Sequence, residues 1–300
     1  MRIAVTGAFS YTGKYIARLL LARGEEVITL TGHLDRPDPF AGRVKAYPLN
    51  FEASSLKASL EGVEVLINTY WVRFDRGRNT QPGAVQNTRL LMEAAKSAGV
   101  KRIVHISITN PSANSHLPYF WGKAANEKAV MDSGLEYAIL RPTVLIGAED
   151  ILINNIAFLL RRFPFFPIPG DGSYRLQPVC VEDLADLAVE AVYAPENSVV
   201  DAVGPDIFTF KQMVQLIGEK IGARRPVLSA PPGLALAAAR FLSFVLGDVL
   251  LTPEEVDGLM AGLLVSNAPP RGRTRLGDWL ESNRSRVGVK YASELKRHYQ

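Results

Sequence analysis

Two residues four positions apart, Tyr119 and Lys123, form the pair in this sequence best suited to proton chemistry. Residues at positions i and i+4 share one face of a helix, so a phenol and an ammonium at this spacing can meet the same ligand. A free tyrosine has a pKa of about 10 and is a poor base at neutral pH, but a nearby cation stabilises the phenolate. The spacing also occurs by chance, and an aromatic residue at the start of a helix commonly only packs.

Two hydroxyl groups precede this pair, on Ser107 and Thr109. They lie at the end of a predicted strand over residues 102–107, and their spacing of two places them on the same face of that strand. Either hydroxyl can donate a hydrogen bond to a substrate carbonyl and stabilise negative charge that develops on its oxygen. Ser107 is the favoured candidate and Thr109 the second. The alternative is that a hydroxyl here only caps the end of the strand.

A glycine-containing turn lies between a predicted strand at 2–6 and a predicted helix at 14–23. At this position of a βα unit, N–H groups at a helix N-terminus bind the pyrophosphate of a dinucleotide. Gly7 permits a tight turn and Gly13 permits close helix–strand packing, whereas Ser10 stands at the usual middle glycine. A glycine pattern alone is weak, but its place at the first strand strengthens it. The predicted cofactor contacts in the turn are Gly7, Phe9, Ser10, Tyr11, Thr12 and Gly13.

The second predicted strand, residues 26–31, ends without the acidic residue that commonly binds the ribose hydroxyls in NAD-specific sites. Thr31, His33 and Arg36 can receive a 2′-phosphate, so NADP is favoured, although the nearby Asp35 keeps NAD open. The alternative is a solvated turn without contact to the adenosine half of the cofactor. Two further candidate contacts follow later strands, and they are Asn50 and Asn68.

A nicotinamide bound by this turn would give the Tyr–Lys pair a redox role. Tyr119 would pass a proton to or from a substrate oxygen while hydride moves at the nicotinamide. Lys123 would lower the pKa of the phenol and also hold the nicotinamide ribose.

Strand-like and helix-like runs alternate along the first half of the chain, which predicts an α/β fold with a doubly wound parallel sheet of the Rossmann type. We expect an NAD(P)-binding core over 1–147 and a smaller, mainly helical substrate lobe over 148–300, with 174–203 returning to the core. Residues 163–172 are predicted to be irregular because prolines and glycines break both helix and strand.

Composition narrows the classes of function. The net charge is only +4 and the basic residues are scattered, which argues against a nucleic-acid partner. The single cysteine, Cys180, excludes an intramolecular disulfide and a cysteine-based zinc cluster, and we expect no metal site. The N-terminus starts directly with a strand and lacks a signal-peptide pattern, so a cytoplasmic protein is expected.

One apolar segment, residues 234–251, is interrupted by Arg240, Gly247 and Asp248. A spanning helix needs about 20 apolar residues with few or no charges. We therefore predict an amphipathic or buried helix, and peripheral membrane contact is the lesser alternative. The sequence leaves the oligomeric state open.

These motifs resemble the extended and atypical branches of the short-chain dehydrogenase/reductase superfamily. Thr6-Gly7 through Gly13, Ser107 and Tyr119-x-x-x-Lys123 match its motifs, and Arg141-Pro142-Thr143 is similar to the segment that borders the nicotinamide. The resemblance therefore implies cofactor contacts from Pro142 and Thr143. Within the superfamily, the chain is most similar to NAD-dependent epimerases/dehydratases, NmrA-like proteins and complex I accessory-subunit-like proteins.

The resemblance implies one of two functions. These branches contain reductases, epimerases and dehydratases, and also cofactor sensors that have lost catalysis and often lack the tyrosine. Because Tyr119 and Lys123 are both present, we expect an NAD(P)-dependent oxidoreductase or epimerase acting on a small alcohol or carbonyl compound. The lobe is rich in apolar residues, so we expect an apolar substrate. The alternative is a non-catalytic NAD(P)-binding redox sensor or accessory module.

Overall fold

The computed structural model describes residues 1–295 and divides the chain into two compact units. The first unit contains residues 1–142 and 181–202, and the second contains residues 143–180 and the chain from 203 onward. The end of the predicted substrate lobe, residues 296–300, lies outside the described residues. The boundaries predicted for functional domains, 147 and 174–203, stay predictions.

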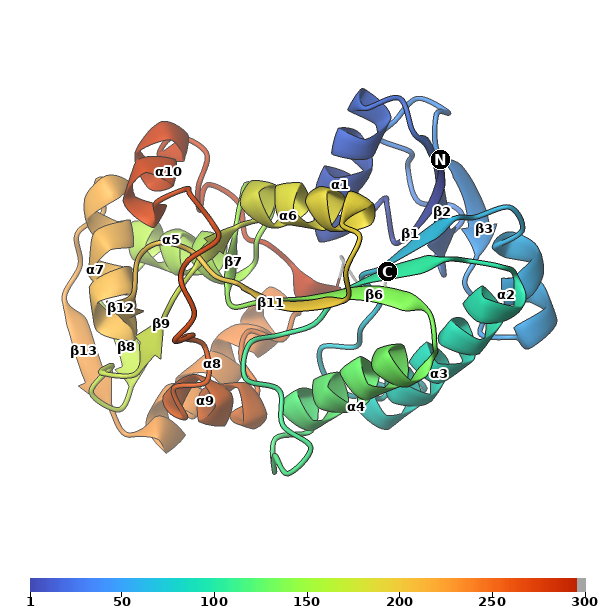
Figure 1. Ribbon diagram of the computed structural model, residues 1–300. Helices are drawn as coiled ribbons and strands as arrows, with labels where there is room; N and C mark the ends of the chain where they lie inside the picture. Colours follow the sequence, from blue (N-terminus) through green and yellow to red (C-terminus); the bar gives the residue numbers. More distant parts are fainter. Residues whose placement is uncertain (296–300) are drawn as a thin grey trace. The chain divides into compact units, whose positions relative to one another are not determined.

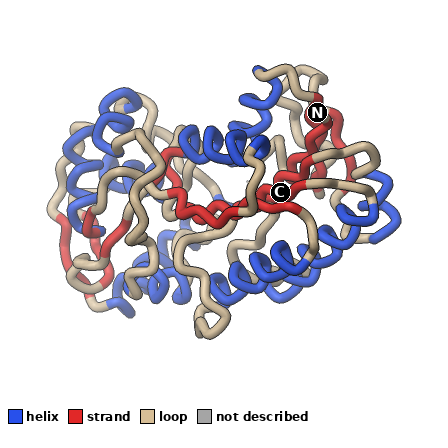
Figure 2. Tube along the Cα trace, viewed as in Figure 1, coloured by secondary structure: helices blue, strands red, loops and turns tan. Residues whose placement is uncertain are grey.

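The first unit is built on a seven-stranded parallel sheet with the strand order β11-β6-β5-β4-β1-β2-β3, drawn in red in Figure 2. The direction in which strands are added reverses between β1 and β4, and ligands of such sheets bind at the carboxyl ends of the strands near this point. This arrangement confirms the predicted Rossmann fold. The strands are β1 (Arg2–Thr6), β2 (Glu26–Thr31), β3 (Lys45–Pro48), β4 (Val65–Asn68), β5 (Arg102–Ile106), β6 (Glu136–Pro142) and β11 (Ser198–Ala202).

Helices cover both faces of this sheet. In Figure 1, α1 (Tyr11–Ala22) and α6 (Val181–Tyr193) lie together on one face, and α3 (Gln81–Ser97) and α4 (Pro118–Asp132) lie on the other. The short α2 (Ala53–Ser59) packs against α3. Because both faces are covered, β4 is buried along its whole length, and its sequence is apolar except for the final asparagine.

The second unit is mainly helical and has a hydrophobic core of its own, which includes Ile153, Leu176, Met213 and Leu280. Its helices are α5 (Leu152–Arg162), α7 (Phe210–Lys220), α8 (Pro232–Leu246), α9 (Pro253–Met260) and α10 (Leu276–Asn283). Its short strands are β7 (Leu145–Ile146), β8 (Phe166–Pro169), β9 (Arg175–Leu176), β10 (Val179–Cys180), β12 (Phe208–Thr209) and β13 (Val227–Ala230).

The strand β8 corrects the prediction that residues 163–172 are wholly irregular. It pairs in parallel with β13, and the flanking amides of Phe166 and Gly170 donate to the carbonyls of Pro226 and Ala230 at 2.9 Å and 2.8 Å. Pro167 and Pro169 occupy the alternate positions, whose missing N–H groups would point away from β13. Proline is therefore tolerated here because β8 pairs on one side only.

The apolar segment 234–251 overlaps most of α8, whose C-cap Gly247 has the left-handed conformation with φ of 63°. Leu234, Phe241 and Phe244 of α8 are exposed. Of the helices within residues 1–295, none combines the length and hydropathy that a membrane-spanning segment requires.

Candidate functional site

The turn between β1 and α1 is held by its own backbone and by one hydroxyl. Gly7 has a left-handed backbone with φ of 68°, and its N–H donates to the Leu30 carbonyl of β2 at 2.9 Å. The Gly7 carbonyl accepts from both the N–H and the Oγ of Ser10, each at 2.8 Å. The Ser10 hydroxyl is thus used inside the turn.

The start of α1 has backbone amides that can bind an anion. A Cβ on Gly13 would collide with the carbonyl of Gly7, so only glycine lets the helix approach the turn this closely. The first intrahelical bond joins the Lys14 N–H to the Ser10 carbonyl at 2.9 Å, and the helix itself does not use the amides of residues 11–13. The turn therefore fits the phosphates of a dinucleotide. The other predicted contacts, Phe9, Tyr11 and Thr12, are half-buried here.

The end of β2 carries the residues predicted to face a 2′-phosphate. The Thr31 hydroxyl accepts from the His33 N–H at 3.0 Å, and the Arg36 N–H donates to the His33 carbonyl at 3.3 Å. One nearby acid, Asp38, accepts from the amides of Phe40 and Gly42 at 2.7 Å and 2.6 Å. Its carboxylate is therefore committed to its own loop.

The predicted contacts Asn50 and Asn68 differ sharply in setting. Asn50 is exposed, and its Oδ1 accepts a long bond of 3.4 Å from the Glu52 N–H. Asn68 is fully buried at the end of β4, where its Oδ1 accepts from the Tyr70 N–H at 3.1 Å and its Nδ2 faces His105 Nδ1 at 3.1 Å. Because that amide nitrogen can only donate, His105 Nδ1 accepts and the ring proton lies on Nε2. Asn68 thereby ties β4 to β5.

His105 and Lys123 form a buried polar pair between β5 and α4. Burial, with a smaller effect of the Lys123 charge, lowers the pKa of His105 from 6.5 to about 3, so the ring is neutral. The Lys123 ammonium donates to the Ile106 carbonyl at 3.0 Å. Burial lowers the pKa of Lys123 from 10.5 to about 7, and Glu127 opposes this by raising it.

Glu127 is itself held by a bidentate ion pair. The Arg141 Nε and Nη2 of β6 donate to its two carboxylate oxygens at 2.9 Å and 2.6 Å. Glu127 is one helical turn beyond Lys123 on α4, so the ion pair fixes the anion that faces the lysine.

The two candidate hydroxyls, on Ser107 and Thr109, have different partners. Thr109 Oγ1 lies 3.0 Å from the carbonyl oxygens of both Arg141 and Pro142, so it ties its segment to the end of β6. Ser107 Oγ is buried and has no hydrogen-bond partner among residues 1–295. A buried hydroxyl without a partner is costly, which suits a group that meets a ligand.

Tyr119 and Lys123 lie side by side at the start of α4, where Pro118 occupies the first turn. The Lys123 ammonium is 6.0 Å from the centre of the Tyr119 ring and 5.0 Å from that of Trp71. The Trp71 ring meets Tyr119 edge-on, with 5.6 Å between ring centres. Trp71 was not among the predicted residues. No motif or spacing in the sequence indicates it.

The last two predicted contacts fall on either side of a unit boundary. Pro142 is the final residue of β6 in the first unit. Thr143 belongs to the second unit, where its hydroxyl donates to the Gln177 carbonyl. That hydroxyl is therefore committed within its own unit.

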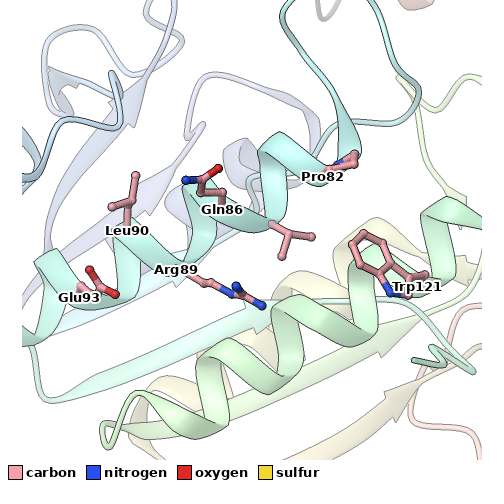
Figure 3. A pocket seen from close by; sticks show the side chains of 7 residues that line it. Pro82, Gln86, Arg89, Leu90, Glu93 and Trp121 are labelled. Atoms are coloured by element: carbon pink, nitrogen blue, oxygen red, sulfur yellow. The ribbon is translucent and has the colours of Figure 1, made fainter. Parts of the chain in front are cut away.

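A surface hollow of 470 Å³ lies along α3 and α4. Figure 3 shows Arg89 of α3 extending toward α4, which carries Trp121. None of the predicted site residues lines this hollow. The lining residues are Pro82, Val85, Gln86, Arg89, Leu90, Glu93 and Trp121.

Comparisons with known proteins agree with the turn and the sheet. Residues 7–162, more than half of the chain, match the family model described as NAD(P)H-binding. The chain is 26% identical over 285 residues to NADH dehydrogenase [ubiquinone] 1 alpha subcomplex subunit 9, mitochondrial, from Arabidopsis thaliana. That alignment covers 88% of this chain and 70% of the plant protein, while several further relatives are covered over only 23% to 62% of their length.

Solved structures show the same fold. A nucleoside-diphosphate-sugar epimerase from Staphylococcus aureus aligns with a TM-score of 0.75 and 18% identity, over 94% of this chain and 100% of that one. An NADPH-dependent quinone oxidoreductase from Escherichia coli, complexed with NADPH, aligns with a TM-score of 0.74 and 21% identity, over 93% and 99%. The chain is thus an NAD(P)-binding protein with an oxidoreductase- or epimerase-like fold. It belongs to the NAD(P)H-binding family.

Proposed function

We propose that this chain is an NAD(P)H-dependent oxidoreductase or epimerase acting on a small, apolar alcohol or carbonyl compound. One observation carries the proposal. The Lys123 ammonium binds the carbonyl of Ile106 and lies one helical turn from Tyr119. Ile106 directly precedes Ser107, whose hydroxyl has no partner in the described part of the chain. These three side chains supply a cation, a hydrogen-bond donor and a proton donor within one part of the first unit.

The proposed reaction divides the work among these residues. The bound cofactor supplies or accepts the hydride. Tyr119 gives its phenolic proton to the carbonyl oxygen as the alcohol forms, and takes it back in the reverse direction. Ser107 donates a hydrogen bond to the same oxygen and stabilises the charge that develops there. The Lys123 ammonium favours the phenolate of Tyr119 and binds the nicotinamide ribose.

NADP is the proposed cofactor in preference to NAD. Asp38 is committed to its loop, and Asp35, the acid that keeps NAD open, is exposed. His33 and Arg36 lie after β2, where a 2′-phosphate would need positive charge and hydrogen-bond donors. The Arg36 side chain would receive this phosphate, with the Thr31 and His33 groups beside it.

The test begins with cofactor binding and turnover. NADPH and NADH are titrated by fluorescence, and NADPH oxidation is then followed across a panel of apolar aldehydes, ketones and quinones. We expect at least one compound to be reduced, and we expect Tyr119→Phe to abolish this turnover while it still binds NADPH. Tyr193→Phe is the matched control, because this tyrosine lies on α6 and donates to Glu25.

A second candidate is a non-catalytic NAD(P)-binding accessory module or redox sensor. The subunit 9 relatives favour it, because their names describe parts of a larger NADH dehydrogenase. The two candidates separate on one measurement. Tight NADPH binding without turnover of any compound in the panel supports the module, whereas turnover that depends on Tyr119 supports the enzyme.

A further inference from the structure

Trp71 connects the loop after β4 to the start of α4, about fifty residues later in the chain. Its indole lies 5.0 Å from the Lys123 ammonium and meets the Tyr119 ring edge-on at 5.6 Å. One side chain thus contacts both members of the Tyr–Lys pair, although neither sequence motif contains it.

The surface of α4 is shaped to receive this indole. A Cβ added to Gly122 would collide with the Cη2 atom of Trp71. Glycine is unfavourable in the middle of a helix by roughly 0.5–1 kcal/mol relative to alanine. Its presence between Tyr119 and Lys123 lets the ring lie directly against the helix.

The ring also meets an electrostatic need of Lys123. This ammonium is buried close to the neutral His105 of β5, and it donates a hydrogen bond to the Ile106 carbonyl. The anion that faces it, Glu127, is shared with Arg141 of β6. The Tyr119 phenol lies on the same helix. The negative face of an indole attracts a desolvated cation, so Trp71 supplies stabilisation that the single shared carboxylate leaves incomplete.

We propose that Trp71 is a positioning residue whose ring keeps Lys123 charged and holds its ammonium between Tyr119 and the end of β5. This inference rests on the proposed function in one respect, which is that the charged form of Lys123 binds the cofactor. Trp71 itself takes no part in proton or hydride transfer.

The test is the pH dependence of NADPH affinity, measured by calorimetry from about pH 6 to about pH 9.5. Affinity is highest while Lys123 is charged, so it falls as the pH rises through the pKa of Lys123. Without the indole that pKa is lower, and the midpoint for Trp71→Leu should move down by about 0.5–1.5 pH units. Trp71→Phe, which keeps a weaker aromatic face, should shift it less.

Two further variants make the test specific. Gly122→Ala keeps the indole but displaces it from the helix, and it should shift the midpoint in the same direction. Trp121→Leu removes the neighbouring tryptophan, which is 37% exposed, and should leave the midpoint unchanged. Thermal melts identify any variant that does not fold. If Trp71→Leu does not fold, Trp71→Phe and Gly122→Ala still test whether the indole acts on Lys123.

Two results would overturn the inference. An unchanged midpoint in both Trp71→Phe and Gly122→Ala would show that the ring does not act on Lys123. Tighter NADPH binding at every pH in these variants would show that the indole obstructs the ligand instead. Neither result depends on a substrate. Absence of turnover with a shifted midpoint would therefore refute the proposed enzyme and leave the role of Trp71 intact.

Discussion

The glycine turn, residues 7–13, and the region where the end of β5 meets the start of α4 both lie in the first unit, but different interactions hold them. We call the second region, which carries Ser107, Tyr119 and Lys123, the β5–α4 edge. In the turn, the Gly7 carbonyl and the Ser10 hydroxyl satisfy one another, and the geometry is set by what a Cβ would strike. At the β5–α4 edge, the Ser107 hydroxyl has no partner among the described residues, and burial lowers the pKa of Lys123. The turn is therefore fixed by steric constraints, whereas the β5–α4 edge is held by buried polar groups and, in our proposal, is completed by a ligand.

The largest expected effect comes from the edge, through Tyr119→Phe. This change keeps the ring against Trp71 and removes only the proton. Loss of one acid–base group costs about 10²–10⁴-fold in kcat, or roughly 3–5 kcal/mol of barrier. NADPH affinity should stay within a few-fold of the wild type. Lys123→Met should instead reduce both quantities, because its ammonium serves the phenol and the ribose.

Steady-state kinetics with any compound reduced by the wild type provide the measurement. Full turnover by Tyr119→Phe would refute the assignment of Tyr119 as the acid–base group. It would also remove the contrast between the two regions, since Tyr119 at the β5–α4 edge would then have only a packing role.

The next effect comes from the turn, through Gly7→Ala. An L-residue in the left-handed conformation costs roughly 1–2 kcal/mol, and the new Cβ would lie 2.6 Å from Ser10 Oγ. We expect the free energy of unfolding to fall by about this amount and NADPH affinity to fall about tenfold or more.

Gly24→Ala is the matched control for the turn. Gly24 has φ of 81° and nothing within 4 Å of an added Cβ, so this variant carries the same backbone cost without the contact. Denaturant unfolding and NADPH titration of both variants separate strain from function. Equal NADPH affinity in the two variants would mean that the turn does not hold the phosphates.

The sequence predicted the first half of the sheet well because buried parallel strands are short apolar runs that end at turns. The predicted ranges 2–6 and 26–31 coincide with β1 and β2. The strand β11 was not predicted, because Ser198–Ala202 mixes half-buried and exposed residues at the edge of the sheet. The strand β8 was not predicted because it contains prolines. They are tolerated because β8 pairs on one side only, with β13, about sixty residues later in the chain.

The candidate site shows the same limit. Motif spacing indicated Tyr119, Lys123 and Ser107, because each follows a fixed point of a βα unit. It could not indicate Trp71, since an aromatic residue in a loop has no pattern that reveals which helix it will reach. It ranked Ser107 ahead of Thr109, but it could not show that the Thr109 hydroxyl is taken up by carbonyl groups at the end of β6.

The pH dependence of Lys123 provides a third prediction. Its pKa is near 10.5 when the chain is unfolded and about 7 when it is folded, so the unfolded state binds more protons between these values. Stability from this group therefore rises as the pH increases from about 7 towards 10.5, and NADPH affinity falls over the lower part of the same range. Opposite slopes are the expected signature.

Lys123→Met should flatten the contribution of this residue to both slopes. Denaturant unfolding and NADPH titration at matched pH values provide the two curves, with Lys128→Met as the control. Lys128 is exposed on the same helix and pairs with Asp132. Parallel slopes in the wild type, or unchanged slopes in Lys123→Met, would contradict the proposed charge state.

The smallest expected effect lies near the turn, at the end of β2, through Arg36→Glu. If Arg36 receives the 2′-phosphate of NADP, the wild type should bind NADPH more tightly than NADH, and the new carboxylate should repel that phosphate while accepting from a ribose hydroxyl. A partly exposed charge pair contributes about 0.2–1 kcal/mol, so reversing one partner should change the NADPH-to-NADH ratio by roughly two- to tenfold. Arg43→Glu is the control, since Arg43 follows the Asp38 loop and its Nε donates to the Phe40 carbonyl. Titration of both cofactors into the three proteins measures the ratio. A wild type that prefers NADH would refute the assignment. The Thr31–Arg36 stretch would then be a structural turn, whose hydrogen bonds join its own residues as the Ser10 hydroxyl does in the glycine turn.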